Sequence, residues 1–233
     1  MCGRYHQHKP IDALALMFEV GEALDEAASF TPRWNIAPTQ HAPVVRARPD
    51  GRRTLSMMRW GLVPPWALDL SGGARCINAR AETAPDKPTF REPVRQRRCL
   101  VPATGWYEWQ VQPDGTPKRA FTFEPTTAFT SAGVFAFAGL WSQWRPRAGG
   151  EVVETFTVLT VDANAVAAVA HARMPLLLAA GAWSHWLDPG ERRVEALAPL
   201  VHTPPDAWIH ARRVGPRVNS VRNDDAALLD PAT

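Results

Sequence analysis

Short strand-like segments separated by turns dominate this chain and restrict what it can fold into. The sequence contains 22 prolines and 15 glycines, many of them between apolar segments. Proline lacks a backbone N–H and glycine favours turns, so both residues interrupt regular structure. Apolar segments bounded by turn residues predict strands over residues 41–47, 54–60, 97–104, 106–111, 119–123, 134–141, 152–160, 174–178 and 209–214.

Helices are expected to be few and short. Apolar side chains recur at helical spacing after Pro10, which predicts a helix over residues 11–18. Asp162 is placed to cap a second helix over 163–170, and a third is expected over 179–187. Loops are expected at 30–38 and 61–74. The pattern indicates a mainly β (α+β) fold with a few peripheral helices.

The length of 233 residues and the apolar content of 45% suit one compact domain over residues 1–233. Residues 218–233 are expected to form an irregular C-terminal tail, and their sequence says little about structure or function. No apolar run approaches the ~20 residues that span a bilayer, and the first residues lack a signal-peptide pattern. We therefore expect a cytoplasmic protein without a membrane partner. No coiled coil or large apolar stripe suggests assembly, so a monomer is expected.

The cysteines favour neither disulfides nor a metal site. Cys2, Cys76 and Cys99 are odd in number and widely spaced, which does not fit a disulfide framework. Cys2 with His6 and His8 lacks a convincing fourth ligand, so a zinc site is not expected. No organic cofactor is expected either.

The basic residues are unevenly divided between two types. The net charge is +3, and the 26 basic side chains include only three lysines, Lys9, Lys87 and Lys118. Arginine is the better residue for bidentate contacts to phosphate. A general preference for Arg, Ala and Pro can also reflect genomic base composition. The basic character therefore permits nucleic-acid binding without establishing it.

Cys2 is a candidate nucleophile because of its place in the chain. Removal of Met1 would leave Cys2 as the N-terminus, with a thiol and a free α-amine on adjacent carbons. The α-amine has a pKa near ~8 and is partly neutral at physiological pH. Such an aminothiol can form an imine with an aldehyde and then close to a thiazolidine ring. The alternative is that Cys2 is an accident of position.

Two titratable side chains are candidates for proton transfer. Glu108 lies in a strand-like segment with Trp106 and Trp109, and an apolar setting would raise the pKa of its carboxyl group. It could equally be a solvent-facing residue of an edge strand. His171 has a pKa suited to acid–base work, although a single histidine in an Ala-rich segment is more often structural.

Other polar and aromatic residues accompany these candidates. Asn78 has an amide that could orient an amine or a sugar oxygen, or could simply end a strand. Arg4, Arg80 and Arg173 each lie within two residues of a candidate, as phosphate contacts would. Solvated surface arginines are the simpler interpretation. Trp66 in a Pro-Pro-Trp loop could stack on nucleobases.

Several motifs in a fixed order give the sequence a recognisable family resemblance. These motifs are Cys2-Gly3-Arg4-Tyr5, Arg33-Trp34-Asn35-Ile36-Ala37-Pro38, Trp60-Gly61-Leu62-Val63-Pro64, Ile77-Asn78-Ala79-Arg80-Ala81-Glu82-Thr83, Gly105-Trp106-Tyr107-Glu108-Trp109, His171-Ala172-Arg173-Met174-Pro175 and Val218-Asn219-Ser220-Val221-Arg222-Asn223-Asp224. Through them the sequence resembles the SOS response-associated peptidase (SRAP) family over nearly its whole length.

The resemblance implies a fold and a function. The fold would be a single SRAP-like domain of short, mostly antiparallel strands around a barrel-like core, with a positively charged channel. The partner would be single-stranded DNA containing abasic sites, and the bound protein would be associated with the nucleoid. The function would be to sense an abasic site and link covalently to its aldehyde.

The resemblance also implies roles for individual residues. Cys2 would be the crosslinking nucleophile, and Asn78 would position the sugar and the terminal amine. Glu108 would be the acid–base group for imine formation and reversal, and His171 would assist proton transfer at the opened sugar. The implied DNA contacts are Arg4, Pro38, Trp66, Arg80, Trp106 and Arg173. The loop continues as Ala67-Leu68, where some relatives carry a second aromatic residue.

Three functional hypotheses remain open from the sequence. The first is an abasic-site sensor that forms a thiazolidine crosslink through Cys2. The second is a thiol peptidase or amidohydrolase with Cys2 as nucleophile, acting on Met1 of its own chain or on other substrates. The third is a protein that binds single-stranded DNA or RNA without a covalent bond, in which the arginines and Trp66 contribute to binding and Cys2 does not.

Overall fold

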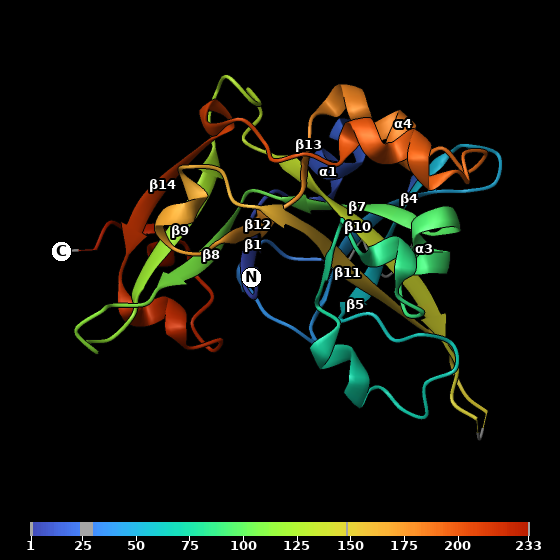
Figure 1. The fold of residues 1–233 in the computed structure, drawn as a ribbon, viewed down its shortest axis with the longest axis horizontal. Coiled ribbons are helices and arrows are strands. Elements are labelled where there is room, and N and C mark those ends of the chain that lie inside the picture. The colour runs from blue at the N-terminus through green and yellow to red at the C-terminus, as the bar shows by residue number, and fades with distance from the viewer. Residues whose placement is uncertain (1, 24–29, 148, 233) are drawn as a thin grey trace.

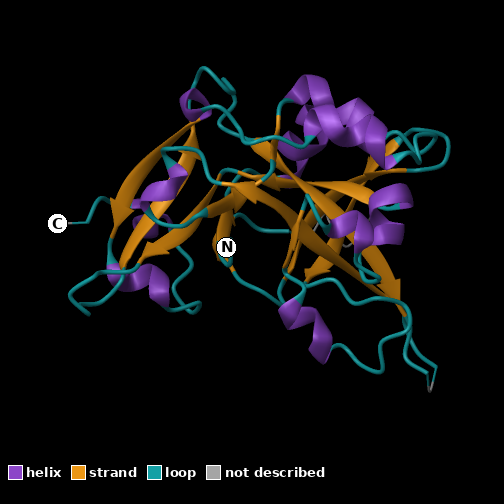
Figure 2. Ribbon diagram, in the orientation of Figure 1, coloured by secondary structure: helices purple, strands orange, loops and turns teal. Residues whose placement is uncertain are grey.

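A computed structural model describes residues 2–23, 30–147 and 149–232 of the chain, and its fold is mainly β (Figure 1). Two sheets form the body of the molecule, and the short helices lie at the outside (Figure 2). This arrangement confirms the expected fold class and its mostly antiparallel strands. The loops between strands carry several of the motifs named above.

The larger sheet closes on itself as a five-stranded barrel. Its strands follow the order β11-β10-β7-β4-β5, and β5 pairs again with β11. The closing contact is parallel and short, with Thr155 opposite Arg59 and Phe156 opposite Trp60. Closure removes the exposed edges that an open sheet would present. The strand bounds are β4 His41–Ala47, β5 Arg53–Trp60, β7 Arg98–Ala103, β10 Phe135–Trp144 and β11 Val153–Asp162.

The second sheet lies beside the barrel and contains the first strand of the chain. Its order is β14-β9-β8-β1-β3, so β1 pairs on both edges. The Tyr5 ring joins the two sheets, because its centroid lies 5.2 Å from Trp60 and 5.8 Å from Phe137. The strand bounds are β1 Tyr5–Gln7, β3 Arg33–Ile36, β8 Gly105–Gln110, β9 Arg119–Pro125 and β14 Ile209–Val214.

Two short strands extend the barrel at the C-terminal end of β11. Strand β6 (Asn78–Arg80) pairs in parallel with β11, and β12 (Arg173–Pro175) pairs antiparallel with it. Both pairings include Thr160. The remaining elements are β2 Val20–Ala23, β13 Leu177–Leu178, α1 Ile11–Met17, α3 Arg91–Gln96, α4 Trp183–Leu187 and several 3₁₀ turns.

The structure corrects several of the expected elements. Residues 30–38 are not only a loop, because β3 forms there and pairs with β1. The segment 163–170 contains only a 3₁₀ turn over Ala167–Val169 instead of a helix. Asp162 does not cap it, since Asn164 Oδ1 accepts from the Ala167 N–H at 2.9 Å. The predicted strand 174–178 is divided into β12 and β13, and 179–187 forms a 3₁₀ turn followed by α4.

The C-terminal tail is irregular but packs against the second sheet. Val218 and Leu228 are buried there in a small core with Tyr107. Asp224 accepts a hydrogen bond from Trp34 N at 2.6 Å and pairs with Arg33. Because these contacts hold β3, and β3 pairs with β1, the tail supports the start of the chain. The tail therefore has a structural role that the sequence analysis did not expect.

No helix within the described ranges is long and apolar enough to cross a membrane.

A buried histidine fixes β1 beneath the barrel. His6 Nδ1 lies 2.8 Å from Thr104 Oγ1, and His6 Nε2 lies 3.1 Å from Thr122 Oγ1. The ring is fully buried, and this burial holds the pKa of His6 well below its ordinary value. The neighbouring His8, stacked on His6, also has a lowered pKa because of burial. Both histidines are therefore neutral in the folded protein at neutral pH.

This burial predicts a loss of stability in mild acid. Below about pH 6.5 the unfolded chain binds protons that the folded protein does not take up. We expect the free energy of unfolding to fall by up to about 1.4 kcal/mol per pH unit for each such histidine. Urea denaturation between about pH 5 and pH 7.5 measures this dependence. The His6→Gln variant should show a shallower dependence, and an equal slope in both proteins would contradict the account.

Candidate active site

The start of the chain is held at the point where the two sheets meet. The carbonyl oxygen of Cys2 accepts a hydrogen bond from Asn78 Nδ2 at 2.7 Å. Asn78 opens β6, which is fixed on β11 by backbone pairing with Val158. The second amide atom, Asn78 Oδ1, is buried and has no hydrogen-bond partner among the described residues. It is therefore available to a ligand donor, such as an amine or a sugar hydroxyl.

The Cys2 thiol is protected from solvent in this state. Cys2 has no exposed surface, and its Sγ lies 3.9 Å from the Arg4 carbonyl oxygen, at the limit of a weak hydrogen bond. Burial raises the pKa of the thiol strongly, and the charge of Glu108 raises it further. The thiol is thus protonated at neutral pH and needs a base to become a nucleophile.

Glu108 is a buried carboxyl group beside that thiol. It lies on β8, and alternation along the strand places its side chain on the same face as Trp106. Its exposed fraction is only 6%. Burial raises the pKa of Glu108 above its ordinary value, while the positive charge of the chain's terminal amine acts in the opposite direction. The solvent-facing alternative for Glu108 is therefore wrong.

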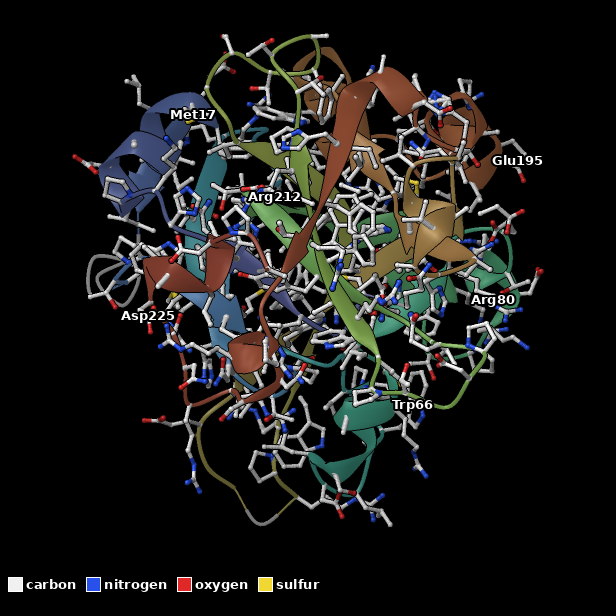
Figure 3. All side chains as sticks on the ribbon, turned by 90° about the vertical axis from the view of Figure 1, so that its left-hand side faces the viewer. Met17, Trp66, Arg80, Glu195, Arg212 and Asp225 are labelled. Atoms are coloured by element: carbon white, nitrogen blue, oxygen red, sulfur yellow. The ribbon has the colours of Figure 1, made fainter. Side chains whose placement is uncertain are left out.

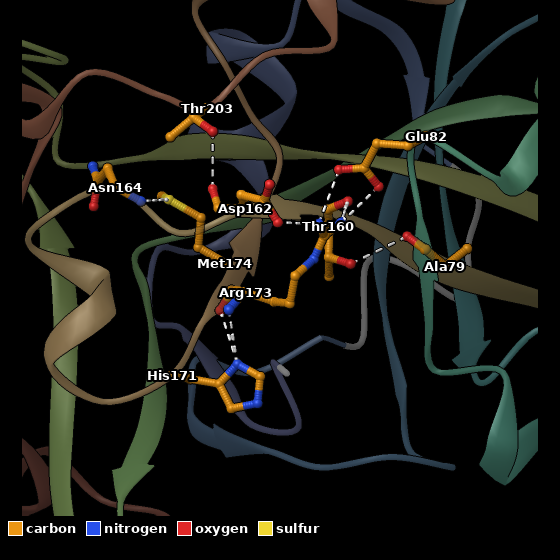
Figure 4. Close-up of polar contacts among 9 residues, drawn as sticks. All are labelled: Ala79, Glu82, Thr160, Asp162, Asn164, His171, Arg173, Met174 and Thr203. Atoms are coloured by element: carbon orange, nitrogen blue, oxygen red, sulfur yellow. Dashed lines mark hydrogen bonds and ion pairs between the residues drawn. The ribbon is translucent and has the colours of Figure 1, made fainter.

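The ring of His171 contacts the backbone of Arg173. Its Nδ1 lies 2.9 Å from the Arg173 N–H, which can only donate, and 3.2 Å from the Arg173 carbonyl oxygen, which can only accept (Figure 4). Either tautomer of the neutral ring therefore finds a backbone partner at Nδ1. Burial lowers the pKa of His171 below its ordinary value. The neutral ring can therefore take up a proton at Nε2.

Three of the four expected catalytic residues lie close together near the start of the described chain. Asn78 holds the Cys2 backbone directly, and the charge of Glu108 acts on the Cys2 thiol. His171 comes directly before β12, which pairs with β11 as β6 does. These residues come from the chain terminus, β6, β8 and the segment before β12, which are distant in sequence. Among the described residues no group of three or more His, Cys, Asp or Glu side chains is arranged to hold a metal ion. The arrangement suits nucleophilic addition assisted by proton transfer.

The three arginines expected to contact DNA lie in different environments. Arg80 is exposed at the end of β6, and its side chain has no hydrogen bond or ion pair to the described residues. Arg4 donates from Nη1 to Asn35 Oδ1 at 2.8 Å and to the Val218 carbonyl oxygen at 3.0 Å. Arg173 forms ion pairs with Glu82 at 2.8 Å and with Asp162 at 2.6 Å (Figure 4). Arg80 is therefore the most accessible of the three.

The expected aromatic contacts also differ from one another. Trp66 is 58% exposed, and it lies on the same side of the view as Arg80 in Figure 3. Pro38 is partly buried and precedes Thr39, which has a positive φ of 71°. Trp106 has no exposed surface and stacks on Phe123 with ring centroids 5.0 Å apart. Trp106 thus forms part of the core under Glu108, and a direct contact of its ring with DNA is not possible in this conformation.

The loop that carries Trp66 is braced by contacts at its middle and at its base. The indole N–H of Trp144 donates to the Ala67 carbonyl oxygen at 2.9 Å. At the base, a Cβ atom on Gly61 would lie 2.6 Å from the Gly73 carbonyl oxygen, so only glycine fits there. Gly61 also has a φ of 115°. Beside Trp66, Leu68 is 72% exposed, which gives the loop a second apolar side chain.

Comparison with known proteins agrees with this geometry. The sequence matches the family described as SOS response associated peptidase (SRAP) over residues 1–221. This chain belongs to that family. It is 35% identical over 231 residues to the abasic site processing protein YoaM of Bacillus subtilis, covering 99% of this chain and 98% of the relative. It is 29% identical over 272 residues to the abasic site processing protein HMCES of Pongo abelii, covering 99% of this chain and 76% of the relative.

A solved structure supports the fold independently. The X-ray structure of a protein from Bacteroides thetaiotaomicron superposes with a TM-score of 0.87 and covers 100% of both chains. Its sequence identity is 22%, so it supports the fold alone. Both relatives are named as abasic site processing proteins.

Several supporting residues of this SRAP domain were not identified from the sequence. Glu82 lies inside a recognised motif, but no role was expected for it. Trp144 has no motif, and Asp162 was expected to cap a helix. Motif position could have drawn attention to Glu82, whereas the contacts of Trp144 and Asp162 depend on tertiary structure.

Proposed function

We propose that this protein binds single-stranded DNA at an abasic site and links to it covalently through Cys2 after Met1 is removed. One observation supports this proposal above the others. Asn78 fixes the Cys2 backbone at 2.7 Å while the buried carboxyl group of Glu108 lies close enough to influence the thiol. A free aminothiol held in this way is suited to capture an aldehyde, the open form of an abasic sugar. Relatives named abasic site processing proteins agree with this substrate.

The chemistry can be written with the residues present. The neutral amine of Cys2 adds to the C1′ aldehyde to give a carbinolamine. Glu108 in its acid form donates a proton to the departing hydroxyl group, and water leaves as the protonated imine forms. The Glu108 carboxylate then takes the thiol proton while sulfur adds to the carbon of the protonated imine, which leaves the ring nitrogen as a neutral secondary amine. The net reaction converts an aldehyde and an aminothiol into a thiazolidine and one water molecule.

The other two residues prepare the reactants. His171 Nε2 can take the proton of the C1′ hydroxyl group and return it to the ring oxygen as the closed sugar opens to the aldehyde. Asn78 Oδ1 can accept from the amine or from a sugar hydroxyl. Holding amine and aldehyde together makes the addition intramolecular, which in well-oriented cases lowers the barrier by roughly 7–11 kcal/mol.

The proposed DNA path uses the exposed side chains of Arg80 and Trp66, which lie on the same side of the view in Figure 3. Arg80 would contact phosphate, and Trp66 together with the partly buried Pro38 would hold the splayed strand. A single strand exposes the damaged sugar and leaves its neighbouring bases free to stack. We propose that the protein acts as a monomer in the cytoplasm, on the nucleoid.

A crosslinking assay tests this function. Incubation with single-stranded oligonucleotide containing an abasic site should give a product that survives heating in denaturant. The Cys2→Ala variant should give none, and neither should a protein with one additional residue ahead of Cys2, because the amine is then blocked. An undamaged oligonucleotide is the matched control. A normal yield from either altered protein would contradict the proposal, and DNA-independent turnover of a peptide would favour the thiol peptidase.

The Glu108→Gln variant tests the acid–base role. Glutamine keeps the shape of the side chain but cannot donate or accept the proton, so formation and reversal of the crosslink should slow by about 10²-fold or more. Affinity for undamaged single strands should change little, because Glu108 is buried. Single-turnover kinetics and fluorescence anisotropy measure the two quantities. A large loss of affinity at an unchanged rate would instead assign Glu108 a structural role.

A further inference from the structure

The turn that carries Pro38 has an unusual backbone. The Gln40 N–H donates to the Ala37 carbonyl oxygen at 3.2 Å, which closes a four-residue β-turn that we call the Pro38 turn (residues 37–40). Pro38 is its second residue, and Thr39 is its third, with a positive φ of 71°. This combination is typical of a type II turn, in which glycine or asparagine is the usual third residue. A β-branched threonine strains the backbone there, and such strain persists only where neighbouring contacts hold it.

Backbone contacts hold the turn against the end of β5. The Thr39 N–H donates to the Trp60 carbonyl oxygen at 2.9 Å, and the Trp60 N–H donates to the Gln40 carbonyl oxygen at 2.9 Å. The indole N–H of Trp60 donates in turn to the carbonyl oxygen of Ile77, the residue before Asn78, at 2.9 Å. The turn and the start of β6 are therefore braced by the same tryptophan.

The side chain of Gln40 adds a second support. Its Oε1 atom accepts from the Ala37 N–H at 3.0 Å and from Arg33 Nη2 at 3.1 Å. Arg33 belongs to β3 and also forms an ion pair with Asp224 of the C-terminal tail. Both contacts of Gln40 use the acceptor atom of its amide. A single oxygen atom thus closes the turn on itself and ties it to the second sheet.

The turn is accessible to a ligand. Thr39 is exposed, and Pro38 and Gln40 are partly buried. Holding an accessible turn in a strained conformation costs free energy in the free protein. Preorganisation offsets such a cost on binding, because the turn does not have to lose conformational freedom when the ligand arrives.

We propose that Gln40 is a positioning residue that holds the strained Pro38 turn in the conformation that receives the splayed DNA strand. The inference rests on the proposed function, in which Pro38 and Trp66 hold that strand. It assigns a role to Gln40, for which the sequence predicted none, and to the ion pair of Arg33 with Asp224 that supports it. Because Gln40 would support a DNA contact, its loss should weaken the capture of DNA and leave the chemical step unchanged.

Two substitutions of Gln40 separate its acceptor atom from the rest of the side chain. Alanine removes the acceptor, whereas glutamate keeps an oxygen that can accept from the same two donors. In single-turnover crosslinking with abasic single-stranded DNA in excess, we expect Gln40→Ala to raise the half-saturating DNA concentration about tenfold. The maximal rate should stay within about twofold of the wild-type rate.

The conservative variant and a matched control complete this comparison. The half-saturating concentration of Gln40→Glu should stay within about threefold of the wild-type value, because Arg33 offsets the added charge. Gln143→Ala, which removes an exposed glutamine of β10, should behave as the wild-type protein does. An unchanged half-saturating concentration in Gln40→Ala would overturn the proposal, and so would a loss confined to the maximal rate. Equal losses in Gln40→Ala and Gln40→Glu would also overturn it.

Amide hydrogen exchange gives a readout that does not require DNA. The Ala37 N–H should exchange at least about tenfold faster in Gln40→Ala, because its acceptor is lost, and at the wild-type rate in Gln40→Glu. The Ala138 N–H, which donates to the Leu176 carbonyl oxygen, should keep its protection in both variants and so report an intact barrel. Equal exchange of the Ala37 N–H in all three proteins would overturn the proposal. If the wild-type protein forms no crosslink, the proposed function fails, while this exchange still decides whether Gln40 holds the turn.

Discussion

The pairing of the first strand on both of its edges is the constraint on which the site depends. Strand β1 lies between β8 and β3, so the residues before it must enter a packed region and not extend into solvent. The tail supports β3 through Asp224, and Asn78 holds the Cys2 carbonyl oxygen. A chain terminus is usually mobile unless it is tied down. Here the terminus is tied by sheet pairing, by the tail and by one side-chain amide.

Burial gives the site a consistent chemical character. It raises the pKa of the Cys2 thiol and of the Glu108 carboxyl group, and it lowers the pKa of His171. All three shifts favour the neutral form, as expected when charged groups lose water. A site of neutral groups can pass protons between an amine, a hydroxyl group and a thiol without creating isolated buried charges. Phosphate recognition is left to exposed groups such as Arg80, outside this buried region.

The sequence was most informative where local pattern and tertiary structure agree. The strand-like segments 41–47 and 209–214 predicted β4 and β14 with their observed bounds. The candidate residues Cys2, Asn78, Glu108 and His171 were predicted from motif chemistry and the family resemblance, and the structure brings Cys2, Asn78 and Glu108 together. Their catalytic roles stay predictions until they are measured. Strand β3 was missed because Pro32 and Pro38 bound a segment that only pairing with β1 makes extended.

Other features depend on contacts between distant residues and could not be obtained from local pattern. The helix expected after Asp162 does not form, because that carboxylate pairs with Arg173 and Asn164 caps a single turn instead. The acidic partners of Arg173 also come from 91 and 11 residues away. The burial of Trp106 likewise follows from packing between the two sheets.

The central claim is that a freed aminothiol at Cys2 captures a sugar aldehyde within this buried site. Intact-mass spectrometry of the purified protein, with and without abasic single-stranded DNA, tests it most directly. The account predicts a chain that lacks Met1 and, with the damaged DNA, a second species heavier by the oligonucleotide less one water. A protein that keeps Met1, or one that lacks Met1 yet shows no such species, would contradict it.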